Sequence, residues 1–242
     1  MQEFKGIFPY LISPVDENGN VKEEVLTRLV HHLIECGVHG LTPLGSTGEF
    51  FYLTWEQKKK IVETVVKAAN HRVPVIAGGA CSNTHEAIEQ TKAFQEIGVD
   101  GILGVLNVYF PLQQNSIYEY YRDLAASTHL PVVIYNNPKI PAFVMQMGGV
   151  GWMSGPACLI PKESVRLYEL CAAKKWDEAM VLQKKLWEIN TIFQKYNLAA
   201  CIKAGLELQG FEVGKPIPPT ARLSQEAVDD IQNVLNRVTD VN

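Results

Sequence analysis

Short apolar runs rich in valine, isoleucine and leucine recur along the chain, and stretches with a helical pattern of polar and apolar residues separate them. The starts of the runs are about 25 to 35 residues apart, the length of a strand–helix unit in an α/β barrel or a doubly wound sheet. The runs do not alternate with polar residues, as expected of parallel strands buried on both faces. The clearest runs are residues 6–14, 38–44, 73–77, 99–105 and 131–135.

Three patterns mark where helices between these runs begin. Each places a side-chain acceptor at the N-cap position and a reciprocal partner three residues later. The predicted pairs are Asn20 with Glu23, Thr54 with Gln57, and Asn83 with Glu86. After the first pair, apolar residues recur at helical spacing from Val21 to Ile34, which predicts a helix that packs one stripe on the sheet.

The strand pattern ends before Pro161, and helical stretches follow to the end of the chain, broken by glycine and proline between Phe211 and Pro219. We therefore expect a barrel over residues 1–160, with the last barrel helix and a helical bundle over residues 161–242.

The regular spacing fails between Pro138 and Ser154. Two strand-like pieces, residues 142–147 and 150–153, leave no room for a helix, because a parallel crossover needs about a dozen residues or more. Compared with a (β/α)8 TIM barrel, the chain lacks about one strand and two helices between Pro138 and Val150. At about 25 to 30 residues per unit, roughly 50 residues are missing. The sequence leaves open whether the protein is shortened here or a segment has been lost from its numbering.

Length and composition agree with one α/β barrel that carries a helical extension. The chain has 242 residues, of which 47 % are apolar and 20 % charged, so it can bury a sizeable core. The net charge of −4 arises from mixed signs along the chain, which favours a small-molecule partner over nucleic acid or a membrane surface. The N-terminus is polar and no apolar run approaches the length of a membrane span, so we expect neither a signal peptide nor a span.

The five cysteines are scattered, and none forms a C-x-x-C pair. An odd number without motif spacing favours reduced, buried thiols over a disulfide framework or a zinc site, and therefore a cytoplasmic protein.

Two segments could carry chemistry. Gly45-Ser46-Thr47-Gly48-Glu49 follows the second apolar run, and in a barrel such a loop lies on the active-site face. Its glycines let backbone N–H groups approach an anion, and its hydroxyls add donors, so it suits a small carboxylate; a simple tight turn is the alternative. Tyr135 ends the fifth run, where its hydroxyl could transfer a proton, or where it could merely pack at the rim.

In this order, the two motifs resemble the family of dihydrodipicolinate synthase and N-acetylneuraminate lyase, and the resemblance extends over nearly the whole chain. The other segments that carry it are residues 6–14 with Asp16-x-x-Gly19, Gly37-Val38-x-Gly40, Pro74-Val75-Ile76-Ala77-Gly78, Gly98-Val99-Asp100-Gly101, Tyr135-Asn136-x-Pro138 and residues 149–161.

The resemblance implies an eight-stranded barrel with a C-terminal helical bundle, assembled as a homotetramer. It also implies a 2-oxo acid substrate held as a lysine Schiff base, with neither metal nor organic cofactor. By position, Gly45, Ser46 and Thr47 would bind the substrate carboxylate, and Ser46 or Thr47 would connect Tyr135 to a proton relay. Tyr135 would be the acid and base, and Met153 would present a backbone group from the last strand.

The sequence departs from the family pattern in three places. The family's Schiff-base lysine lies on a sixth strand that is not found. Lys139 adjoins Pro138 and Lys203 falls in a helical pattern, so neither is assigned, and the lysine stays unknown. Ile140 stands where dihydrodipicolinate synthases have a basic residue. The tyrosine pair of those synthases reads here as Tyr109-Phe110, so Tyr109 keeps a substrate-binding role and the second hydroxyl is lost.

These observations predict a lyase, either an aldolase or a dehydratase, that acts on pyruvate or on a sugar-acid-derived 2-oxo acid. Two alternatives stay open at this point. One is a dihydrodipicolinate synthase proper. The other is a barrel that binds a 2-oxo acid without turnover, if the sixth-strand lysine is truly absent.

Overall fold

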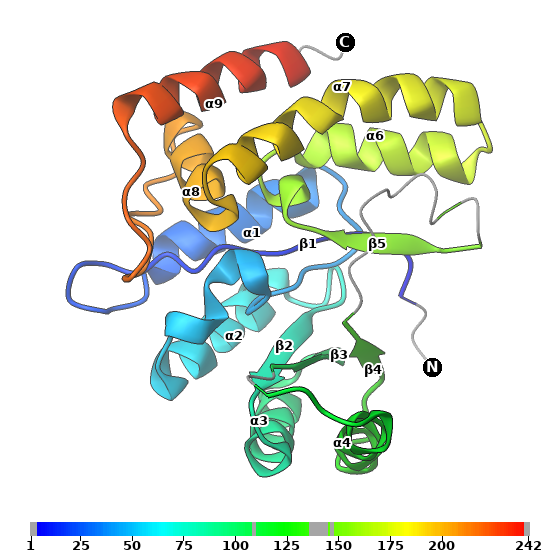
Figure 1. Ribbon diagram of the computed structural model, residues 1–242. Coiled ribbons are helices and arrows are strands. Elements are labelled where there is room, and N and C mark those ends of the chain that lie inside the picture. The colour runs from blue at the N-terminus through cyan, green and yellow to red at the C-terminus, as the bar shows by residue number, and fades with distance from the viewer. Residues whose placement is uncertain (1–3, 108–109, 136–144, 146–147, 240–242) are drawn as a thin grey trace.

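Five parallel strands form the inner layer of the molecule in the computed structural model, which describes residues 4–107, 110–135, 145 and 148–239 (Figure 1). Strand β1 (Gly6–Pro9) pairs with β5 (Gly151–Ser154), with Gly6 opposite Gly151. Strands β2 (Ile76–Cys81), β3 (Gly101–Leu106) and β4 (Val132–Ile134) form a second parallel group in that order. The apolar runs thus become strands, with boundaries shifted by a few residues.

The run at residues 38–44 is the exception, because it makes only two single parallel bridges instead of a regular strand. Tyr10 pairs with Thr42, and Leu41 pairs with Val75, so this segment lies between β1 and β2. Prolines at positions 9, 43 and 74 interrupt the ladder, since proline has no N–H to donate. Their carbonyls still accept backbone hydrogen bonds, for example from Thr42 to Pro9 at 3.0 Å.

These pairings give the spatial order β5, β1, the 38–44 segment, β2, β3, β4, which is that of a (β/α)8 barrel with an opening between β4 and β5. Within the described part of the chain, no strand pairs with the outer edge of β4 or of β5. The opening coincides with the break in the sequence spacing. The expected strand piece at 142–147 falls outside the described residues apart from Met145.

Four helices cover the outside of the strands: α1 (Glu23–Glu35), α2 (Trp55–Ala69), α3 (Thr84–Ile97) and α4 (Gln114–Ala126). The predicted N-caps of α2 and α3 are confirmed. Thr54 and Gln57 form a reciprocal capping box, and the Asn83 side chain accepts a hydrogen bond from the Glu86 N–H at 2.9 Å.

The predicted cap at Asn20 is wrong. Helix α1 begins at Glu23 after Lys22, which makes no side-chain cap. The Asn20 amide donates instead to Asp16 Oδ2 at 2.9 Å, and its backbone N–H donates to Asp16 Oδ1 at 2.8 Å. The aspartate therefore organises a turn of its own before the helix, as short polar side chains commonly do.

Helices follow β5 to the end of the described chain, as the sequence predicts: α6 (Pro161–Ala172), α7 (Trp176–Lys195), α8 (Leu198–Leu208) and α9 (Gln225–Val238). In Figure 1, α6, α7 and α9 lie together on the side of β1 and β5. One hydrophobic cluster includes Leu29 of α1, Leu167 of α6 and Ile202 of α8, so the barrel helices and the C-terminal helices share a core. The domain boundary at residue 160 remains a prediction.

A second, smaller cluster fills the inside of the barrel. Phe8, Tyr10, Ile76 and Leu103 are its buried members, and Tyr135 and Met153 pack against it. Because β1 runs from Gly6 toward Tyr10, Tyr10 belongs to the upper layer, at the carboxyl ends of the strands. Active sites in barrels of this kind lie above that layer.

Within the described residues, no helix is long and apolar enough to cross a membrane. All five cysteines are free thiols, and all except Cys36 are buried.

Candidate active site

A cavity of about 650 Å³ opens at the carboxyl ends of the strands and continues along the gap between β4 and β5. Ser46, Tyr135 and Met153 line it, although they come from three separate segments of the chain. Barrel residues form one wall of the cavity. Residues of α7, including Gln183, Asn190 and Phe193, form another. Cavities of this size commonly hold small organic ligands.

The loop over residues 45–49 is folded as a short 3₁₀ turn, Ser46–Gly48, and its two glycines are required by close packing. A Cβ atom at Gly45 would lie 2.3 Å from Cδ1 of Tyr10, and one at Gly48 would lie 2.8 Å from the carbonyl oxygen of Leu11. The Ser13 hydroxyl donates to the Gly48 carbonyl at 2.7 Å and so holds the turn against the segment that follows β1. The glycines therefore let the loop backbone rest on the barrel's upper layer.

The two hydroxyls of this loop have different environments. Ser46 is exposed and lines the cavity, so it can contact a ligand directly. Thr47 is fully buried, and its Oγ1 has no hydrogen-bond partner among the described residues. Thr47 packs on Gly155, where a Cβ would lie 2.9 Å from Oγ1. A buried hydroxyl without a partner is costly for the fold, so Thr47 is the residue of the loop that most needs a ligand or water.

Tyr135 directly follows β4, and its backbone N–H donates to the Gly104 carbonyl at 3.0 Å, which extends the β3–β4 pairing by one residue. Its half-buried side chain lines the cavity. Met153 lies opposite Phe8 in the β1–β5 pair and lines the same cavity. The structure thus brings Ser46, Tyr135 and Met153 together around one cavity, whereas Gly45 and Thr47 are buried and are not among its lining residues. Tyr109 lies outside the described residues.

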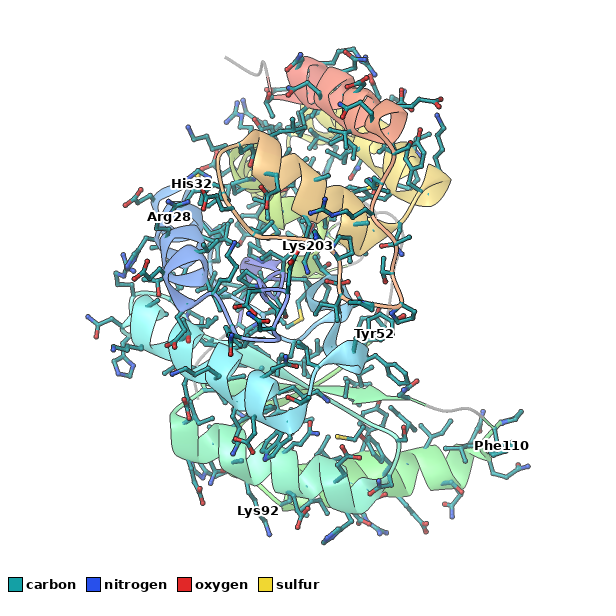
Figure 2. The ribbon with its side chains drawn as sticks, turned by 90° about the vertical axis from the view of Figure 1, so that its left-hand side faces the viewer. Arg28, His32, Tyr52, Lys92, Phe110 and Lys203 are labelled. Carbon is teal, nitrogen blue, oxygen red and sulfur yellow. The ribbon has the colours of Figure 1, made fainter. Side chains whose placement is uncertain are left out.

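Sequence reasoning missed a buried ion pair behind the loop. The Lys203 ammonium lies 2.6 Å from Glu49 Oε2, and the two side chains are 1 % and 2 % exposed. The ammonium and the carboxylate attract each other strongly here, because both groups are removed from solvent. Figure 2 shows Lys203 in the middle of the molecule, between α8 and the barrel segments.

The pair joins three parts of the chain. Lys203 Nζ also donates to the Lys215 carbonyl at 2.9 Å, and Glu49 Oε1 accepts from the Ile217 N–H at 2.8 Å. Glu49 itself has a left-handed backbone with φ of 52°, which a residue with a side chain adopts only when its surroundings hold it there. Burial lowers the pKa of Lys203, while the Glu49 carboxylate opposes that shift. The pair therefore anchors the end of the 45–49 loop to the C-terminal bundle.

The placement of Lys203 on a helix of the bundle, expected from its spacing, is confirmed by α8. Ala199, Ile202 and Leu206, on the same helix, are also buried. A lysine among apolar residues at helical spacing was therefore the one sequence signal for the buried ion pair.

Among the described lysines, Lys5 lines the cavity, but at the opposite end of β1 from Tyr10. Lys139 and Ile140 lie outside the described residues. The described residues contain no cluster of histidine, cysteine and acidic side chains that could hold a metal.

Comparison with known proteins matches this chain to one family. The model of the dihydrodipicolinate synthetase family matches residues 3–147 and 140–238. The 4-hydroxy-tetrahydrodipicolinate synthase of Methanopyrus kandleri is 26 % identical over 289 residues, with 97 % of this chain and 95 % of the relative covered. The corresponding synthase of Phenylobacterium zucineum is 41 % identical over 135 residues, which cover 56 % of this chain and 46 % of the relative. This last match therefore spans about half of the relative's length.

The fold has equally close counterparts. A crystal structure of a dihydrodipicolinate synthase from Bacillus anthracis superimposes with a TM-score of 0.91 at 25 % identity, covering 98 % of this chain and 99 % of that one. The Methanopyrus kandleri alignment is also informative, because its 289 positions include 97 % of the 242 residues of this chain, which leaves about 54 positions with no residue of this chain opposite them. A deficit of this size agrees with the missing segment of roughly 50 residues estimated from barrel geometry. The superposition on the Bacillus anthracis structure confirms the predicted barrel fold.

Proposed function

Since this chain belongs to the dihydrodipicolinate synthetase family, a family of lyases, we propose that it binds pyruvate or a related 2-oxo acid at the barrel mouth and serves a lysine Schiff-base lyase reaction. The observation that carries the proposal is the convergence of Ser46, Tyr135 and Met153 on one cavity at the carboxyl ends of the strands. Those residue types supply a carboxylate contact, a proton donor and a backbone group, which together are what a 2-oxo acid requires.

The chemistry assigns a distinct task to each group. A lysine amine adds to the keto carbon and water leaves, so that a protonated imine draws electrons from C3 and stabilises the carbanion formed there. Ser46, with the backbone of the 45–49 loop, holds the carboxylate. Thr47, whose Oγ1 has no hydrogen-bond partner among the described residues, links the carboxylate site to the relay. Tyr135 donates and accepts the protons that imine formation and C–C bond cleavage or addition demand.

A second candidate function has its own supporting observation. In the described part of the chain, no lysine other than Lys5 lines the cavity, and Lys203 is engaged in the ion pair with Glu49. A barrel without a lysine at its mouth would bind the 2-oxo acid and release it unchanged.

Trapping with borohydride separates the two functions. We expect that incubation with pyruvate and borohydride, followed by intact-mass and peptide mass spectrometry, reveals one modified lysine. Pyruvate binding by calorimetry without any adduct would leave the non-catalytic barrel as the function. Absence of both binding and adduct would contradict the proposed site altogether.

Tyr135→Phe provides the matched test of the relay. The fold should persist, because the ring remains, while turnover should fall by roughly 10²- to 10⁴-fold, the usual contribution of a positioned acid or base. Activity within about threefold of the parent would remove Tyr135 from the mechanism.

The identity of the second substrate is also a proposal. The tyrosine pair of the lysine-pathway synthases is replaced by Tyr109-Phe110, which favours a relative acting on sugar-acid-derived 2-oxo acids over a dihydrodipicolinate synthase proper. Turnover assays distinguish these two activities. Pyruvate is the common substrate, and turnover is compared between an aldehyde co-substrate of the sugar-acid enzymes and that of the dihydrodipicolinate synthases. The homotetramer and the cytoplasmic location implied by the family belong to the same proposal, and sedimentation velocity tests the former.

A further inference from the structure

Tyr10 occupies a position in the candidate site to which no role has been given. Its backbone lies between two neighbours, because its N–H donates to the Ser154 carbonyl at 2.9 Å and Tyr10 forms a parallel bridge with Thr42. Alternation along the strand then places its side chain on the same face as Phe8, inside the barrel. Tyr10 is therefore part of the floor beneath the cavity.

The 45–49 loop is fitted to the Tyr10 ring. A Cβ at Gly45 would lie 2.3 Å from Cδ1 and 2.9 Å from Cε1 of this ring, so only a glycine allows the loop backbone to rest on it. The ring is 9 % exposed and lines the cavity together with Ser46 and Tyr135. Loop and phenol thus form one surface, on which a ligand held by Ser46 would lie.

The Tyr10 hydroxyl is free to serve such a ligand. It makes no hydrogen bond to any residue that the structure describes, unlike the hydroxyl of Tyr196, which donates to Asp230 Oδ2 at 2.7 Å. Burial, and next the proximity of Tyr135, raise the pKa of Tyr10 well above its ordinary value. The group therefore stays protonated over the whole physiological range and can act as a donor but not as a base.

We propose that the Tyr10 hydroxyl is a substrate-binding donor, which gives the bound 2-oxo acid a second phenolic hydrogen bond on the side of the pocket formed by β1. This inference rests on the proposed function. It gives the pocket a second phenolic hydroxyl besides that of Tyr135, and both residues line the same cavity. Tyr135 then remains the group that moves protons, while Tyr10 holds an oxygen of the ligand.

Pyruvate titration by calorimetry tests the proposal on the full chain and on three variants. Tyr10→Phe removes only the hydroxyl, and we expect pyruvate affinity to fall about tenfold, the effect of losing one hydrogen bond to a charged or strongly polar ligand. Tyr10→Ala removes the ring as well and should bind at least as weakly. The control is Tyr120→Phe, because Tyr120 is 4 % exposed, its hydroxyl also lacks a partner among the described residues, and it lies on α4 away from the described lining of the cavity.

The outcomes separate this inference from the proposed function. Equal pyruvate affinity of the parent and Tyr10→Phe overturns the inference and leaves the proposed function standing, even if Tyr10→Ala binds weakly, since ring packing alone would explain that loss. An equal loss in Tyr120→Phe overturns it as well, because the effect would then be unrelated to the site. Failure of the parent to bind pyruvate overturns the proposed function and the inference together. A tenfold loss confined to the Tyr10 variants supports both.

Discussion

Replacing Lys203 with methionine should destabilise this protein far more than replacing an exposed lysine that also makes an ion pair. Methionine has nearly the length of the lysine stem, so the change removes the ammonium while filling most of its volume. What remains is the Glu49 carboxylate, 2 % exposed, with the Ile217 N–H at 2.8 Å as its remaining donor among the described residues. An unpaired charge in such a position is the dominant cost of the variant.

The expected magnitude follows from the geometry of the pair. At the 2.6 Å separation of Lys203 Nζ and Glu49 Oε2, an effective dielectric constant of about 20 gives an attraction of about 6 kcal/mol. Removing the ammonium also removes the cost of burying it, which is several kcal/mol. Measured losses for breaking one side of a buried pair are about 3–5 kcal/mol. For a chain of this length, each kcal/mol shifts the melting temperature by about 2–4 °C, so the expected drop is about 6–20 °C.

Urea and thermal unfolding of four proteins test this reasoning. The exposed control is Lys195→Met, whose ammonium lies 2.7 Å from Asp230 but is half exposed, so its loss should cost much less stability than the loss of the Lys203 ammonium. The double variant Lys203→Met/Glu49→Gln removes both charges and should recover at least half of the stability lost by Lys203→Met. If Lys203→Met loses no more stability than Lys195→Met, the Lys203–Glu49 pair does not behave as a buried ion pair. The inference that it anchors the 45–49 loop would then be wrong.

Two further predictions concern the loop and the start of β1. Thr47→Val should weaken pyruvate binding while leaving the free energy of unfolding equal or higher, because it replaces a buried hydroxyl that has no partner in the described part of the chain. Thr54→Val should leave binding intact but cost about 0.5–2 kcal/mol of stability, because Thr54 caps α2. Calorimetry and unfolding of both variants decide this, and unchanged affinity in Thr47→Val would reduce the loop to a turn. The neutral ring of His39 accepts a hydrogen bond from the Ile7 N–H at 3.2 Å, and burial lowers the pKa of His39 below its usual 6.5. The contribution of neutral His39 to stability is therefore fully present above pH 6.5 and is lost as the pH falls through its lowered pKa. Over that pH range, the melting temperature of the parent should fall more than that of His39→Asn. Parallel plots of melting temperature against pH for the two proteins would contradict this role of His39.

The sequence by itself determined the elements whose signals are local. The cap at Thr54 and the cap at Asn83 each depend on residues three positions apart, and both form as predicted. The order of the motifs around the 45–49 loop and Tyr135 identified the family, and the loss of regular spacing after Pro138 located the opening between β4 and β5. The failure at Asn20 is also local, because Asp16, four residues earlier, competes for the same side chain.

Only the tertiary structure decided what lies behind and beneath the loop. Glu49 and Lys203 meet through the packing of α8 on the barrel, and no spacing along the chain records that contact. Tyr10 reads in the sequence as one more apolar strand residue, and its place on the cavity floor follows from its pairing with Thr42 and Ser154. Parallel strands are joined through long crossovers, so the register that sets which side chains share a layer is fixed by distant backbone partners and not by neighbours in sequence.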